Sequence, residues 1–163
     1  MIGDPGMIPF KKILCPSDFS DPSYNALVMA DKLAKSLDAE LFVLHIVPTI
    51  PLLYYPSPMG PDEYVDFNVV TYQDALLKEA HRKMDSVVEE KISPEVKVHK
   101  VVLQGAAAEE IVKYAEAAGV DLIVISTHGN TGLNLLVFGS VADKVVRSAE
   151  CPVLTMRRQD ARS

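Results

Sequence analysis

The sequence predicts one α/β domain, with a five-stranded parallel sheet that carries helices on both faces. Short apolar runs rich in β-branched residues alternate along the chain with longer segments whose apolar residues recur at helical spacing. Little sequence separates the two kinds of segment, and a helix between two strands lets those strands run parallel. The 163 residues suit a single domain with a substantial core.

The first strand is expected at Lys11–Pro16, where two lysines precede an apolar run. Asp21 suits the N-cap of the helix that follows, and Pro22 suits its first position. Apolar residues then recur every three or four positions, which predicts that this helix runs to about Leu37. A second apolar strand is expected at Glu40–Val47.

An insertion at residues 48–70 interrupts the alternation of strands and helices. Its prolines disfavour regular structure, whereas its tyrosines and leucines are unusual for a plain disordered linker. Two interpretations stay open. The segment is either a partly ordered flap, over the carboxyl edge of the sheet or a partner subunit, or a mobile loop.

The second half of the chain resumes the alternation. A helix is expected at Thr71–Ser93, and Pro94 ends it. Val96–Leu103 alternates apolar with polar residues, as a half-exposed edge strand would. The next helix is expected at Ala107–Ala118, with Gly119 suited to its C-terminal cap.

The last elements surround a loop marked by glycines. Leu122–Ile125 is apolar enough for a strand buried on both faces, a helix is expected from Ser140, and a final strand at Pro152–Met156. Five strands in this series suit a flavodoxin-like or Rossmann-like sheet of order 3-2-1-4-5, whose ligands bind where the winding reverses. Here that crevice lies between the first strand, ending at Pro16, and the fourth, ending at Ser126.

The loop after the fourth strand carries the candidate ligand-binding motif. It reads Ser126-x2-Gly129-x9-Gly139-Ser140. Glycine lets a ligand approach the backbone, and the N–H groups of a first helical turn attract anions, so this arrangement suits a phosphate. The pattern matches neither the GxxxxGK[ST] loop nor the GxGxxG dinucleotide motif.

This motif resembles that of the universal stress protein family, whose ATP-binding members carry G-x2-G-x9-G-[ST] at this place. The spacing is the same, and Ser126 replaces the first glycine. Lys11–Ser20 is similar to the family's opening strand and its aspartate, His45 ends the second strand as in the family, and Cys151–Leu154 is similar to its last strand. The resemblance covers residues 10–158.

The resemblance implies a site for ATP, AMP or ADP, with Mg²⁺ held through the phosphates. Asp18 would accept hydrogen bonds from the ribose or the base, and Ile46 would lie along the adenine. Ser126, His128 and Gly129 would line the ribose and phosphates, and the N–H groups of Gly139, Ser140 and Val141 would bind the outer phosphates. The implied nucleotide-binding residues are Pro16, Ser17, Asp18, Ile46, Ile125, Ser126, His128, Gly129, Gly139, Ser140, Val141 and Ala142.

Simpler roles remain open for several of these residues. Asp18 could cap the loop at Phe19 and Ser20, Ile46 could belong to the core, and Ser140 could be a helix N-cap. Ser126 lowers affinity if the first glycine is needed for a positive φ or for space, and it is harmless if a small residue suffices. No metal-ligating set of side chains is expected.

Three alternative functions are compatible with these interpretations of the motif. The first is a nucleotide-binding module that acts as a stress-response or signalling switch. The second is a slow ATPase, and the third is a family member that acts through protein contacts without nucleotide. Dedicated catalysis is not expected, because residues 126–140 contain no lysine or arginine to stabilise phosphoryl transfer.

Composition indicates which classes of partner and which cellular location to expect. The net charge of −6 argues against a nucleic-acid surface, and no segment reaches the roughly 18 apolar residues of a membrane span. The first residues do not read as a secretory signal, and two cysteines are few for a secreted domain, so a cytoplasmic location is expected. The expected organisation is a disordered leader at 1–9, a domain at 10–158 and a tail at 159–163.

The strand order carries two further expectations. Cys15 and Cys151 would lie two strands apart, at about 10 Å, which is too far for a disulfide. The fifth strand would be an edge, and its uncharged run suits antiparallel pairing with a second copy in a homodimer, as the resemblance also implies. That run is Val153, Leu154, Thr155 and Met156. The alternative is that the tail covers this edge.

Overall fold

A computed structural model of the chain describes residues 10–50, 69–127 and 139–157. Its strands are β1 (Lys12–Pro16), β2 (Glu40–Val47), β3 (Val98–Gln104), β4 (Leu122–Ser126) and β5 (Val153–Met156). Its helices are α1 (Asp21–Leu37), α2 (Val69–Lys91), α3 (Ala107–Ala118) and α4 (Ser140–Ser148). The leader, the tail and most of the insertion, residues 51–68, lie outside the described residues.

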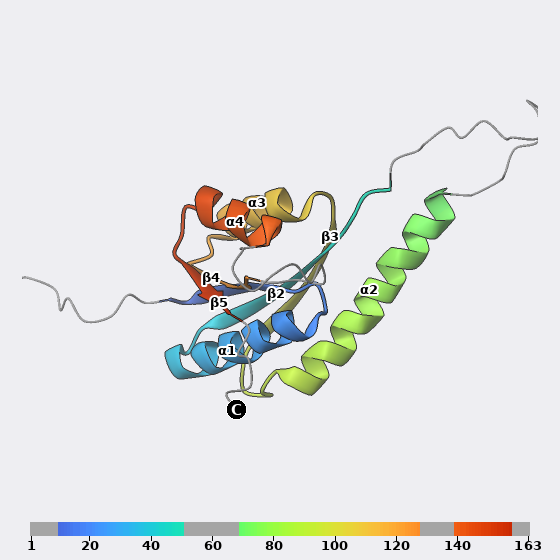
Figure 1. The fold of residues 1–163 in the computed structure, drawn as a ribbon. Coiled ribbons are helices and arrows are strands. Elements are labelled where there is room, and N and C mark those ends of the chain that lie inside the picture. The colour runs from blue at the N-terminus through green and yellow to red at the C-terminus, as the bar shows by residue number, and fades with distance from the viewer. Residues whose placement is uncertain (1–9, 51–68, 128–138, 158–163) are drawn as a thin grey trace, which may run out of the picture.

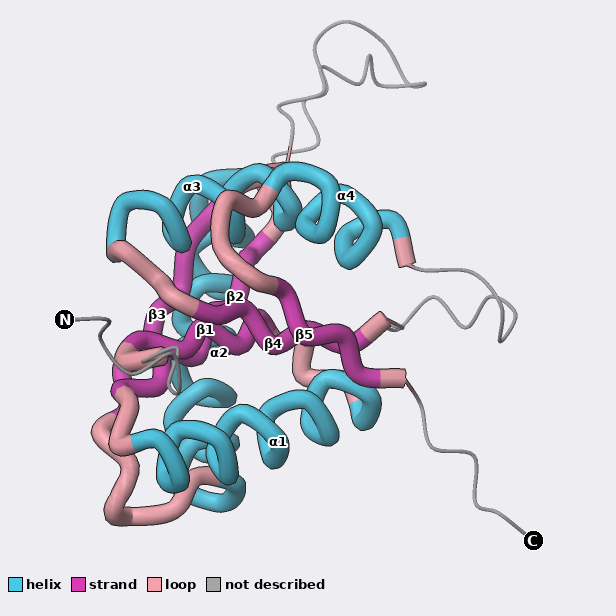
Figure 2. The backbone as a smooth tube through the Cα atoms, turned by 90° about the vertical axis from the view of Figure 1, so that its left-hand side faces the viewer, coloured by secondary structure: helices cyan, strands magenta, loops and turns pink. Residues whose placement is uncertain are grey.

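The predicted sheet is confirmed. The strands form one five-stranded sheet of order β3-β2-β1-β4-β5, and every neighbouring pair is parallel. Helices α3 and α4 cover one face, and α1 and α2 cover the other (Figures 1 and 2). The chain therefore has the doubly wound, flavodoxin-like arrangement, with β3 and β5 as its edges.

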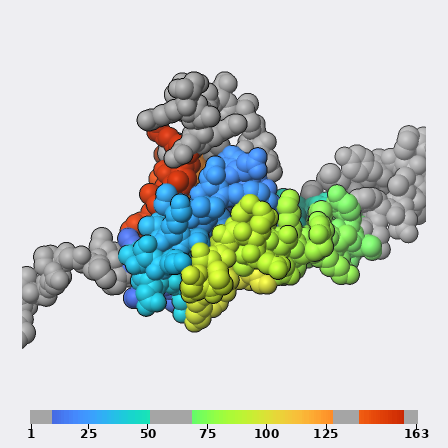
Figure 3. Space-filling view, turned by 90° about the horizontal axis from the view of Figure 1, so that it is seen from below, coloured from blue at the N-terminus to red at the C-terminus, as the bar shows by residue number. Residues whose placement is uncertain are grey.

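Alternation along the strands divides the core into two clusters. Ile13 and Cys15 of β1 face α1 and α2, whereas Leu14 faces α3 and α4. The same split holds on β2, where Val43 and Leu44 fall into different clusters. Figure 3 shows the α1 and α2 face of the molecule from outside, where these two helices lie side by side and cover the sheet.

Several element boundaries differ slightly from the sequence expectation. Ser20, not Asp21, is the N-cap of α1, since its side chain accepts a hydrogen bond from the Ser23 N–H. Asp21 occupies the first turn instead, where its charge favours the positive end of the helix dipole. Helix α2 begins at Val69, so the end of the expected insertion is helical.

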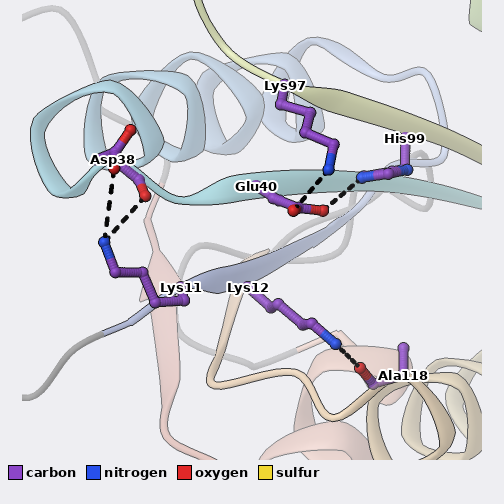
Figure 4. Close-up of polar contacts among 7 residues, drawn as sticks. All are labelled: Lys11, Lys12, Asp38, Glu40, Lys97, His99 and Ala118. Carbon is purple, nitrogen blue, oxygen red and sulfur yellow. Dashed lines mark hydrogen bonds and ion pairs between the residues drawn. The ribbon is translucent and has the colours of Figure 1, made fainter.

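The amino-terminal edge of the sheet is held by polar contacts (Figure 4). Glu40 at the start of β2 pairs with Lys97 and with His99, each at 2.7 Å. Lys12 at the start of β1 donates to the Ala118 carbonyl of α3 at 2.7 Å. Asp121 accepts the backbone N–H groups of both Lys11 and Lys12 at 2.8 Å. These groups fix the amino ends of the strands and leave the carboxyl ends for a site.

Two buried side chains tie the helices on the α1 and α2 face to the loops. Asp31 of α1 accepts the N–H and the hydroxyl of Ser93, at 2.9 and 2.8 Å, in the loop after α2. Gln73 of α2 accepts the Ile50 N–H at 3.0 Å and donates to the Pro48 carbonyl at 3.2 Å. Gln73 thus holds the chain leaving β2 against the start of α2.

The two cysteines are not bridged, as the strand order predicts. Cys15 is fully buried, and burial raises the pKa of its thiol to about 12. A thiol of that pKa stays protonated near neutral pH, so Cys15 is a core residue and not a nucleophile. Among the described residues, no helix is long and apolar enough to cross a membrane.

Candidate functional site

A cavity of about 250 Å³ opens at the carboxyl ends of the strands, where the winding of the sheet reverses between β1 and β4. It is formed by the ends of β1, β2 and β4, the loop before α1, and the first turns of α3 and α4. Its lining residues are Pro16, Ser17, Asp18, Ser23, Leu44, His45, Ile46, Ala107, Ile111, Ile125, Ser126, Thr127, Gly139, Ser140, Val141 and Ala142.

The structure brings ten of the twelve expected binding residues to this one cavity. The other two, His128 and Gly129, lie outside the described residues. Sequence reasoning left six lining residues out of the site, and two of them could have been found. Leu44 lies two positions before Ile46 and so faces the same side of the sheet. Ala107 begins the helix that packs on that side.

One wall of the cavity is apolar. Leu44 and Ile46 of β2, Ile125 of β4 and Ile111 of α3 belong to the cluster under α3 and α4. Because residues two apart on a strand face the same side, the last residues of β2 and β4 extend this cluster to the cavity. The apolar wall suits a flat, uncharged ring such as a nucleobase.

The loop between β1 and α1 forms a polar wall and is held by serines. The Ser23 hydroxyl donates to the Ser20 carbonyl at 2.9 Å, so in the 2.8 Å contact between Ser17 and Ser23 the Ser17 hydroxyl is the donor. Ser17 Oγ in turn accepts the Phe19 N–H at 3.1 Å. Asp18 Oδ1 accepts both the N–H and the hydroxyl of Ser20. The loop-capping role of Asp18 is therefore present, and Asp18 also lines the cavity.

Phe19 lies at the centre of this loop with a positive φ of 61°. Bulky residues rarely adopt this conformation, which costs about 1–2 kcal/mol. Its ring stacks on the imidazole of His45, with 4.2 Å between centroids, and Lys83 Nζ of α2 lies 5.2 Å from the ring centre. These contacts offset the strain and fix the loop against β2 and α2.

His45 contacts the loop through its ring nitrogen as well. Its Nδ1 lies 2.7 Å from the Ser17 carbonyl oxygen. Burial lowers the pKa of His45, with a further lowering by Lys83, and the Ser17 bond and the Asp18 charge oppose this shift. A neutral imidazole that faces a carbonyl must carry its proton on Nδ1.

The first turn of α4 forms the end of the cavity. Gly139 is the N-cap, so the alternative role of Ser140 as N-cap is wrong and Ser140 takes the first helical position. The Gly139 N–H donates to the Thr127 carbonyl at 2.7 Å, whereas the sequence expectation gave this N–H to a phosphate. Helix geometry leaves the N–H groups of Ser140, Val141 and Ala142 without acceptors in their own helix, and all three residues line the cavity.

The charge of the lining residues limits what the cavity can do. The lining residues that the structure describes include one carboxylate, Asp18, and no lysine or arginine. In the described ranges, no group of three or more His, Cys, Asp or Glu side chains could hold a metal ion. The described walls offer an apolar surface, hydroxyl groups and the first turn of a helix.

Comparison with known proteins identifies the family of this fold and site. The model of the universal stress protein family matches residues 9–157. Universal stress protein MJ0531 of Methanocaldococcus jannaschii is 38% identical over 149 residues, which are 91% of this chain and 83% of that protein. Universal stress protein MJ0577 of the same organism is 33% identical over 161 residues, which are 93% of this chain and 98% of that protein.

Solved structures agree with this assignment. One solved structure was used for a structure-based assignment of the biochemical function of MJ0577. It has a TM-score of 0.74 and 30% sequence identity to this chain, and the match covers 94% of this chain and 100% of that one. Universal stress protein UspA from Lactobacillus plantarum has a TM-score of 0.71 and 26% identity, and covers 93% of this chain and 100% of that one. The chain belongs to the universal stress protein family.

Proposed function

We propose that this protein binds an adenine nucleotide, ATP or AMP, in the cavity at the carboxyl ends of β1 and β4, and acts as a nucleotide-dependent switch. The observation that carries the proposal is the meeting of three features in one cavity. These are an apolar wall around Ile46 and Ile125, the Asp18 carboxylate, and the first turn of α4. A nucleotide presents a flat base, ribose hydroxyls and an anionic tail, and each has a matching wall here.

In this proposal the base lies on the apolar wall, with the backbone of Ile46 at its edge. Asp18, which lines the cavity, accepts hydrogen bonds from the ribose hydroxyls. The phosphates bind the N–H groups of Ser140, Val141 and Ala142 at the positive end of α4. Mg²⁺ would supply positive charge to the phosphates, and we expect the Ser140 hydroxyl to help hold it.

Related structures support an adenine ligand. A universal stress protein has been solved in complex with cAMP, and one from Archaeoglobus fulgidus in complex with dAMP. Those proteins share the fold with this chain, at TM-scores of 0.57 and 0.55 and identities of 22% and 20%. Binding by them makes an adenine nucleotide the first ligand to test here.

The biological part of the proposal is a stress-response or signalling module in the cytoplasm. Nucleotide binding in the cavity would change the state of a dimer or the binding of a protein partner. The described walls carry no lysine or arginine to stabilise phosphoryl transfer, so we expect ATP hydrolysis to be slow or absent.

The test begins with the protein as purified. Heat denaturation releases any tightly held nucleotide, which chromatography of the supernatant identifies. Nucleotide-free protein is then titrated with AMP and with ATP, each with and without Mg²⁺. Saturable binding of one nucleotide per chain supports the proposal. Accumulation of ADP during incubation with ATP would favour the slow ATPase instead. Absence of both retained and titratable nucleotide would favour a member that acts by protein contacts alone.

A further inference from the structure

We propose that His45 is a positioning residue for nucleotide binding, which holds the loop between β1 and α1 from behind and so sets Asp18 in the cavity. This inference rests on the proposed function, because it concerns how the cavity is shaped for that ligand. His45 is itself among the residues that line the cavity, and the role proposed for it here is exerted through the loop.

The position of His45 on β2 separates its ring from the apolar wall. Leu44 and Ile46 pack with the cluster under α3 and α4, whereas Leu41 and Val43 pack with the cluster under α1 and α2. Alternation along the strand places the side chain of His45 with the second pair. The imidazole therefore approaches the loop from the side opposite the apolar wall.

Two contacts let the imidazole fix the loop. The Nδ1–H donates to the Ser17 carbonyl at 2.7 Å, and the ring stacks on Phe19 at 4.2 Å with 25° between the planes. Ser17 and Phe19 flank Asp18 on either side. A residue whose two neighbours are both held by one side chain has little freedom to turn its own backbone.

The conformation of Phe19 explains why this support is needed. With φ at 61°, Phe19 is held in a region that a phenylalanine leaves readily when its contacts are lost. The turn it makes directs the N–H and hydroxyl of Ser20 back to Asp18 Oδ1. If the stack on His45 is removed, relaxation of Phe19 would turn the Asp18 carboxylate away from its place in the cavity.

A double-mutant cycle tests this role. We expect His45→Leu to weaken AMP binding by about tenfold or more in an otherwise unchanged chain, and by less than about twofold when Asp18→Ala is already present. His45→Asn carries an amide nitrogen at the place of Nδ1 and should recover part of the affinity. His81→Leu, at an exposed position of α2, is the matched control and should bind as the unchanged protein does.

The outcomes separate this inference from the proposed function. If the unchanged protein binds no adenine nucleotide, the proposed function fails and this inference fails with it. If it binds and His45→Leu binds equally well, or loses the same factor with and without Asp18→Ala, only the positioning role is wrong. Should His45→Leu not fold, the imidazole nitrogen spectrum of the unchanged protein decides. An Nδ1-protonated neutral ring is expected, and an Nε2-protonated ring would overturn the role.

Discussion

At the scale of single residues, Gly139 has little room for a side chain. A Cβ added there would lie 3.1 Å from the Thr127 carbonyl oxygen, which also accepts the Gly139 N–H at 2.7 Å. We expect Gly139→Val to push the first turn of α4 from Thr127 and to weaken ATP binding by about tenfold or more, or at least 1.4 kcal/mol. Titration calorimetry measures this. Unchanged affinity with a native circular dichroism spectrum would remove α4 from the site.

Ser126→Gly is the companion change at the other end of the motif. Ser126 ends β4 and lines the cavity, and its φ is not among the positive values in the described residues. Since its backbone conformation does not require glycine, we expect Ser126→Gly to leave ATP affinity within about threefold. A much larger gain would mean that the serine side chain itself obstructs the ligand.

The lowered pKa of His45 predicts how the thermal stability of the protein depends on pH. Its pKa in the folded chain is lowered, chiefly by burial, so the folded state takes up its proton less readily than the unfolded state does. The stabilising contribution is therefore present above the unfolded pKa of about 6.5 and is lost as pH falls through the lower folded value. We expect the thermal midpoint to fall more steeply below about pH 6.5 for the unchanged protein than for His45→Asn. Parallel curves would contradict the shift.

At the scale of elements, the link between α1 and the loop after α2 is open to a stability test. Asp31 is buried and accepts two hydrogen bonds from Ser93. Asp31→Ala should leave the Ser93 N–H without its acceptor, at a cost of about 1.5–3 kcal/mol in the free energy of unfolding. Urea unfolding measures the loss. Asp85→Ala, at an exposed carboxylate within α2, is the control and should cost far less.

Most of the elements could be predicted from the sequence because the spacing of the apolar residues agrees with the capping residues, prolines and glycines at the ends of each element. The β2 and α3 bounds match the expectation, since Glu40–Val47 is apolar apart from Glu40 and His45, and Gly119 closes α3 in the left-handed conformation. The N-cap of α1 was misplaced because Asp18, Ser20 and Asp21 all suit that position, and only the fold decides among them. Gly139 bonding to Thr127 was missed because it depends on where the intervening loop returns.

The candidate site was predictable to a similar extent and for a similar reason. A motif marks the loops at the strand ends, so Asp18 and Ser140 could be expected at the cavity that they line. His45 was noted as a motif residue, but the positioning role proposed for it depends on its ring, and no local pattern shows that Phe19 stacks on that ring. Ile111 was missed because its place depends on how α3 crosses the sheet.

At the scale of the whole molecule, the open edge of β5 leads to a prediction about the oligomeric state. The Pro152 and Met156 carbonyls accept hydrogen bonds from β4, so by alternation the backbone groups of Val153 and Thr155 point away from it. Leu154 exposes 38% of its surface beside this edge. We propose a homodimer through antiparallel β5 pairing, which gives these outward groups partners.

Thr155→Pro deletes one outward donor without touching the bonds to β4, so it should shift the protein from dimer to monomer. Light scattering at micromolar concentration measures the mass. Thr155→Val keeps the N–H group and is the control, which should remain dimeric. An unchanged protein that is monomeric at this concentration, or a folded Thr155→Pro variant that stays fully dimeric, would rule out the β5 interface.

The most direct measurement of the central claim is a map of amide chemical shifts during titration of the isotope-labelled protein with AMP. A nucleotide bound in the cavity should shift the amides of Asp18, Ile46, Ser126, Ser140 and Val141 together, with one saturation curve. Amides at the amino-terminal edge, such as Lys12 and Glu40, should not move. Shifts confined to another face of the molecule, or no saturable shifts at millimolar AMP and ATP, would contradict nucleotide binding at this site.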